Sequence, residues 1–128
     1  MNLTELEQKV YDEGLIVEDY HLPDRIKGLI YENHIALQKG MTSKERLCVL
    51  AEEYAHHVIS YGNILNTRIE NNSFQEAKAR RYAYDMLLGK EIVEKEIKSG
   101  KSSIYELSEA LELPGEFVSA ALKNYGVI

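Results

Sequence analysis

Cysteine, proline and tryptophan are scarce in this sequence, which has one cysteine, two prolines and no tryptophan among its 128 residues. The single thiol, Cys48, excludes an intramolecular disulfide and is typical of a protein from a reducing compartment. No apolar run approaches the roughly 20 residues that span a bilayer. The residues from Met1 to Glu5 lack the basic and apolar segments of a secretory signal. We therefore expect a cytoplasmic protein that does not enter a membrane.

Positive charge is also in short supply. Lysine and arginine total 15 against 21 acidic residues, which leaves a formal net charge of -6. Nucleic acids and anionic membranes attract basic surfaces, so direct binding to either is not expected. The content of 45% hydrophobic and 28% charged residues is that of a folded chain. The length favours a single domain over residues 1–128, with a core region at 1–100 and a C-terminal helical pair at 101–128.

Hydrophobic spacing and turn residues predict an α+β fold that is mostly helical. The elements expected first are a helix over 3–13, an extended segment at 15–17 and strands at 28–31 and 34–37. Glu32-Asn33 between the two strands predicts a tight hairpin turn. The helices expected after them cover 43–61, 74–88, 91–98, 102–113 and 114–125. Thr42 or Ser43 caps the first of these helices, and Pro114 is expected at position N1 of the last.

The long helix in the middle of the sequence has apolar residues on two sides. One stripe along it consists of Leu47, Leu50, Ala51, Tyr54, Ala55 and Val58. Glu52 and His56 lie roughly opposite this stripe, yet Val49 and Ile59 flank them. A helix that is apolar on both sides belongs in the centre of the fold, where Cys48 is expected as a buried core residue. Ionisable groups in such a place need partners, because burying an unpaired charge is costly.

The same helix carries a candidate metal-binding motif, Ala51-Glu52-Glu53-Tyr54-Ala55-His56-His57. It resembles the zinc-peptidase motif HExxH with glutamate in place of the first histidine. Positions i and i+4 project from one face of a helix, so Glu52 and His56 can bind one metal ion. Glu53 stands where such enzymes keep the carboxylate that activates water. A catalytic zinc site needs a third protein ligand, and Glu76, near the start of the next helix, is the best candidate.

Two stretches, 49–57 and 75–84, together resemble the ImmA/IrrE family of metallopeptidases, in the short form encoded by phages and mobile elements of Gram-positive bacteria. The family pairs an LAHELGHH-like helix with an E-x-x-A-x-x-F/Y-A helix whose first glutamate completes the zinc site. The resemblance implies a small zincin-like domain that binds Zn²⁺ or Mn²⁺, with its catalytic core in residues 1–100. The residues implied are the metal ligands Glu52, His56 and Glu76 and the general base Glu53. His57 and Arg80 are candidates for the second shell of this site.

The reaction implied by the resemblance is cleavage of a helix-turn-helix repressor that belongs to a phage or mobile element. Glu52 departs from the family pattern, and a set of two carboxylates and one histidine makes a harder zinc site than two histidines and one carboxylate. A second hypothesis therefore stands beside the first. In it the chain is a weakly active or inactive relative that binds a repressor without cleaving it.

Plainer interpretations of these residues stay open. The acidic residues of the motif can be solvated charges on a helix surface, and Glu76 can pair with Arg80 one turn later. His57 points about 100° away from His56 around the helix, as a second-shell or surface residue does. Glu53 with His57 has the same i,i+4 spacing and forms an alternative register.

The last 27 residues, 102–128, have the pattern of two short helices joined by a turn that is typical of a helix-turn-helix. They lack the positive charge of a DNA-binding one. They contain one basic residue, Lys123, and the acidic residues Glu106, Glu109, Glu112 and Glu116. A recognition helix needs lysine or arginine to contact phosphates, so DNA binding is not expected. A scaffold or a docking surface for the repressor is the better interpretation of this pair.

Overall fold

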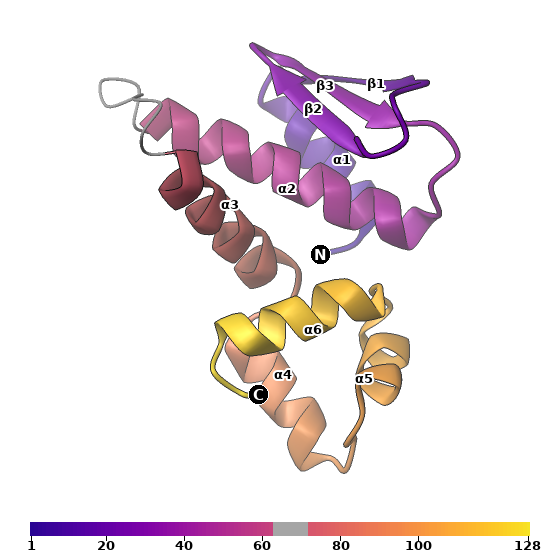
Figure 1. The fold of residues 1–128 in the computed structure, drawn as a ribbon, viewed down its shortest axis with the longest axis vertical. Helices are drawn as coiled ribbons and strands as arrows, with labels where there is room; N and C mark the ends of the chain where they lie inside the picture. The colour runs from indigo at the N-terminus through magenta and orange to yellow at the C-terminus, as the bar shows by residue number, and fades with distance from the viewer. Residues whose placement is uncertain (63–71) are drawn as a thin grey trace.

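The structure is a computed structural model that describes residues 1–62 and 72–128, and the elements within these ranges form an α+β fold (Figure 1). Its helices are α1 (Leu3–Asp12), α2 (Ser43–Gly62), α3 (Asn72–Leu87), α4 (Lys90–Lys98), α5 (Ile104–Leu111) and α6 (Gly115–Asn124). Its strands are β1 (Ile16–Tyr20), β2 (Gly28–Tyr31) and β3 (His34–Gln38). The predicted α+β class with a helical majority is confirmed. Within the two described ranges, no helix has both the length and the apolar character needed to cross a bilayer.

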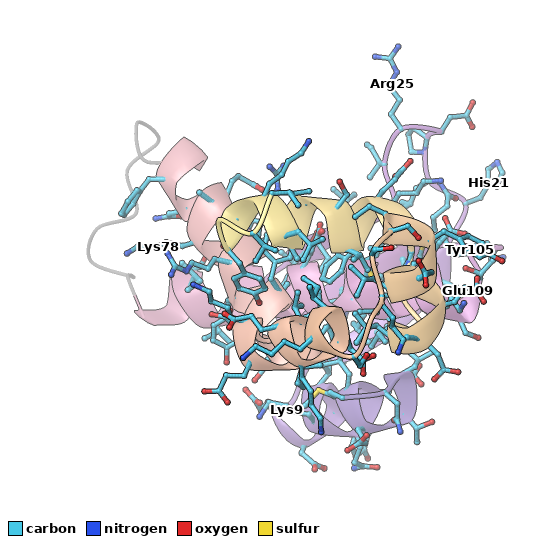
Figure 2. All side chains as sticks on the ribbon, turned by 90° about the horizontal axis from the view of Figure 1, so that it is seen from below. Lys9, His21, Arg25, Lys78, Tyr105 and Glu109 are labelled. Atoms are coloured by element: carbon cyan, nitrogen blue, oxygen red, sulfur yellow. The ribbon has the colours of Figure 1, made fainter. Side chains whose placement is uncertain are left out.

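The three strands form one sheet in the order β1-β3-β2. The hairpin of β2 and β3 is confirmed, with Tyr31 paired to His34 across the turn Glu32-Asn33. Glu32 takes a left-handed φ of 53°, which the tight turn requires. β1 joins the other edge of β3 in a parallel arrangement. The connection between β1 and β2 projects from the body of the molecule, and Arg25 on it extends away from the helices (Figure 2).

Helix α2 is the centre of the fold, as its two apolar sides predict. It passes between the sheet and α1 on one side and α3 on the other (Figure 1). The predicted stripe is buried at Leu47, Leu50, Ala51, Tyr54 and Ala55, and Val58 is half-buried. Across the helix, Val49 and Ile59 are half-buried as well. The helix therefore holds Glu52 and His56, which are both half-buried, between two packed layers.

The ends of α2 and α3 follow local signals in the sequence. Thr42 caps α2, because its Oγ1 accepts a hydrogen bond from the Glu45 N–H at 3.2 Å. The Glu45 carboxylate accepts in turn from the Thr42 N–H at 3.4 Å, which completes a capping box. The predicted stop at Gly62-Asn63 agrees with the last residue of α2, whereas Asn63 and Asn71 lie outside the described residues. Helix α3 begins two residues before the predicted start at Phe74.

The C-terminal helices pack against the rest of the chain through α3. The Tyr125 hydroxyl donates to the Asp85 carboxylate at 2.9 Å and accepts from the Gly89 N–H at 3.3 Å. The expected position of Pro114 is wrong by one residue. It is the N-cap of α6 with an extended ψ of 141°, so the helix begins at Gly115. The chain turns sharply between α5 and α6, where Glu112 has a left-handed φ of 55°, and an extended Pro114 completes that turn.

Candidate metal centre

The candidate ligands meet where α3 packs along α2. His56 lies in the fourth turn of α2, and Glu76 lies in the second turn of α3. The Nε2 atom of His56 is 3.3 Å from Oε1 of Glu76. The His56 side chain is 23% exposed and that of Glu76 is 50% exposed, so solvent reaches the pair from one side. The structure therefore brings these two residues, which are 20 positions apart in the sequence, into contact.

The distance between the two side chains suits a shared metal ion. Zinc holds histidine nitrogen and carboxylate oxygen at about 2.0–2.2 Å, and two such ligands in a tetrahedron lie about 3.3 Å apart. The same distance also allows an ion pair when the imidazole is protonated. The donor types and their separation thus fit two positions of a zinc or manganese site.

Glu52 lies one turn before His56 and is half-buried. Burial raises the pKa of the Glu52 carboxyl above its ordinary value. The positive charge of Arg80 acts against this rise and lowers the pKa, as His56 does to a smaller extent. Glu76 raises the pKa again, so Glu52 is electrostatically coupled to both members of the pair.

Glu52 is nevertheless not gathered into one cluster with His56 and Glu76. In the part of the chain that the structure describes, no three side chains of histidine, cysteine, aspartate or glutamate are grouped closely enough to hold a metal ion. Glu52 instead lines a cavity of about 410 Å³, together with Arg80 and Tyr84 of α3. Two of the three predicted ligands are therefore in contact, and the third lies one turn away beside an arginine.

Glu53 sits on the side of α2 that faces strand β2. A Cβ atom added to Gly28 would come within 3.1 Å of the Glu53 side chain, so the absence of a side chain there lets the strand approach the helix closely. Burial raises the pKa of Glu53 to about 7, with smaller contributions from the carboxylates of Glu52 and Glu76. A carboxyl with this pKa can both accept and release a proton near neutral pH, as a general base must.

His57 and Cys48, which lie on the same helix as the candidate ligands, pack against or within the hydrophobic core. The ring of His57 is 6.4 Å from that of Tyr54, a buried core residue, at an interplanar angle of 33°. Cys48 is buried as predicted, and burial raises the pKa of its thiol to about 12. A thiol with this pKa stays protonated at neutral pH, which suits a packing role and not a reactive one.

Sequence reasoning missed the residues that complete the cavity beside Glu52. Lys27 precedes β2, and Pro114, Glu116, Phe117 and Ala120 belong to the start of α6. These residues come from segments far apart in the sequence. No local pattern links them, because only the packing of α6 against α3 brings them to α2. Helix α6 with its N-cap Pro114 thus forms one wall of the cavity that Glu52 lines.

Comparison of this chain with protein-family models, with curated proteins and with solved structures found no match.

Proposed function

We propose that this protein is a metal-dependent endopeptidase of the ImmA/IrrE type. The observation that carries the proposal is the contact of His56 with Glu76, in which the His56 Nε2 atom is 3.3 Å from Oε1 of Glu76. Beside this contact, Glu53 has a pKa of about 7. A pair of metal-type donors next to a carboxyl that titrates near neutrality is the arrangement that metal-assisted hydrolysis needs.

His56 and Glu76 would hold the metal ion, and Glu52 would supply the third protein ligand. A bound zinc or manganese ion would polarise the carbonyl group of the peptide bond and acidify a water molecule. Two carboxylates and one histidine form a harder donor set than two histidines and one carboxylate, which brings manganese into consideration beside zinc.

Glu53 is the residue that moves protons in this proposal. In its ionised form it accepts a proton from the attacking water, and afterwards it donates that proton to the leaving amine. Its half-buried position beside Gly28 keeps part of the solvent away, which is why its carboxyl retains a proton to higher pH than an exposed one. The cavity lined by Glu52 and Arg80 is where we place a substrate side chain.

The substrate class that we propose is a helix-turn-helix repressor of a phage or mobile element. It rests on the resemblance of residues 49–57 and 75–84 to the family. The acidic character of the chain agrees with it, because a repressor presents a basic surface to DNA, and a protein with a net charge of -6 attracts such a surface. We expect the partner to be a protein, without a direct contact between this chain and nucleic acid.

One observation favours a second candidate, a protein that binds the repressor without cleaving it. Among the described residues, no set of three ligands is assembled, and Glu52 lines the cavity with Arg80 instead of closing on His56. A protein that only sequesters its partner needs no assembled metal site. Cleavage and metal content separate the two candidates.

The proposed activity is tested by digesting a library of peptides of many sequences with the purified protein and locating new termini by mass spectrometry. We expect cleavage within the peptides when Zn²⁺ or Mn²⁺ is present and none after treatment with EDTA. Cleavage that persists in EDTA would contradict a metal-dependent mechanism. Absence of cleavage under all conditions, in a sample that binds a repressor, would favour the second candidate.

A further inference from the structure

The three-stranded sheet has one face packed against helices and one face exposed. In Figure 1 the sheet lies at the top of the molecule, with α1 and α2 below it. Ile35 and Leu37 of the central strand β3 are buried on the packed face. Because side chains alternate between the two faces of a strand, His34 and Ala36 belong to the opposite face. The strand register adds their neighbours, so the outer face of the sheet consists of these two residues with Ile16, Glu18, Leu29 and Tyr31.

The outer face is more apolar than a solvated sheet face usually is. A sheet with one solvated face normally alternates apolar residues inward with polar residues outward. Here the outward residues Ile16, Leu29 and Tyr31 have exposed fractions of 45%, 48% and 75%. Tyr20, two positions after Glu18 on β1, extends the same face and is 46% exposed. Exposed apolar side chains gathered in this way, from both edge strands of the sheet, are typical of an interaction surface.

The ionisable side chains of the outer face are in contact with one another. Oε1 of Glu18 is 3.6 Å from Nδ1 of His34, on the neighbouring strand. The Glu18 carboxylate also accepts a hydrogen bond from the Tyr20 hydroxyl at 3.2 Å. Among the strand residues of this face, no carboxylate is therefore left without a partner. A basic protein such as a repressor is attracted by free carboxylates, which this face does not offer.

We propose that the outer face binds a second copy of this chain, so that two sheets pack face to face about a two-fold axis. Two chains that each carry a net charge of -6 repel one another, and they approach at the lowest cost through a surface whose charges are already paired. The shape of the face also suits its own copy. Two sheets pack with their strands within about 30° of each other and about 10 Å apart, and their apolar side chains interdigitate.

The proposed interface lies on the opposite side of the sheet from the candidate metal centre. Helix α2 carries Glu53 and His56 and packs on the covered face, where Gly28 of β2 comes close to Glu53. A second copy on the outer face therefore leaves that centre accessible. The inference does not rest on the proposed function, and dissociation of the dimer should leave the metal content unchanged.

Sedimentation equilibrium of the purified chain tests the oligomeric state. We expect a dimer at roughly 100 µM and a dissociation constant raised roughly 30-fold or more in Tyr31→Glu, because this change brings a charge into the apolar contact from both copies. The matched control is Tyr11→Glu, which makes the same change on α1 at an equal exposed fraction of 75%. It should dimerise as the wild type does.

Three results of this experiment would overturn the proposal. The first is a wild type that is monomeric at this concentration, or that forms an assembly of another size. The second is a dimer that Tyr31→Glu does not weaken. The third is an equal loss in Tyr11→Glu, because the added charge would then act through the net charge of the chain and not through the outer face.

Chemical cross-linking tests which surface joins the two copies. Ala36 lies on the central strand of the outer face, so a thiol there should be close to its counterpart across the axis. We expect Ala36→Cys to form a covalent dimer with a short bismaleimide, and the addition of Tyr31→Glu to abolish it. The wild type should stay monomeric on a denaturing gel after the same treatment, because its thiol, Cys48, is buried.

Glu91→Cys is the matched control for the cross-link, because it places a thiol at an exposed position of α4. It should form little covalent dimer. A dimer in solution whose Ala36→Cys variant is not cross-linked, or that is cross-linked equally well through Glu91→Cys, would overturn the face-to-face arrangement.

Discussion

Replacing Glu53 with glutamine is expected to reduce peptide cleavage by about 10²- to 10⁴-fold, the range that a general base contributes. Glutamine has the same shape as the half-buried glutamate but cannot accept a proton from water at neutral pH. The fold and the metal content should be those of the wild type, because Glu53 is not among the ligands. The measurement is the initial rate of cleavage of one peptide, with metal content and circular dichroism recorded on the same sample.

The matched control is Glu91→Gln, which makes the same chemical change at an exposed position of α4. It should cleave at the wild-type rate. The rate of the wild type should also rise with pH up to about 7, because Glu53 must lose its proton before it can act as a base. Cleavage retained by Glu53→Gln would show that this residue is not the base.

Replacing Glu52 with histidine is expected to raise the affinity for Zn²⁺ by tenfold or more and to raise the rate of cleavage. The imidazole is a softer donor than the carboxylate, and it completes a set of two histidines and one glutamate with His56 and Glu76. Affinity is measured by calorimetry and cleavage with the peptide used for Glu53.

Glu91→His is the control for this change, because it adds a histidine at an exposed position of another helix and should leave both quantities unchanged. If Glu52→His gains neither affinity nor activity, the remaining residues do not form a competent site. The protein would then be better described as one that binds a repressor without cleaving it.

Much of the fold was predictable because its signals are local. The hairpin turn at Glu32-Asn33, the cap at Thr42 and the helical spacing of apolar residues each act within a few positions of the chain. The parallel pairing of β1 with β3 was not predicted, since it joins segments about 18 residues apart and depends on how both cover α1 and α2. The displaced start of α6 has a similar origin. Pro114 suits a helix start, but the turn from α5 decides which residue begins it.

The candidate site was also predictable only in part. The i,i+4 spacing of Glu52 and His56 is a property of one helix and can be seen in the sequence. The contact of His56 with Glu76 spans two helices, and it was predicted from the ligand count that zinc requires and from the resemblance. The cavity that Arg80 shares with the start of α6 could not be predicted, because it exists only after the C-terminal helices have packed. The raised pKa of Glu53 likewise depends on burial beside Gly28 of another element.

The most direct test of the central claim, that this chain holds a metal ion at the contact of His56 with Glu76, is the metal content of the purified protein by elemental mass spectrometry. The wild type and His56→Ala are compared, each as purified and after incubation with Zn²⁺ and Mn²⁺ followed by removal of free metal. We expect close to one zinc or manganese ion per chain in the wild type and a loss of most of it in His56→Ala. Absence of metal from both proteins after incubation, or equal amounts in both, would contradict the claim.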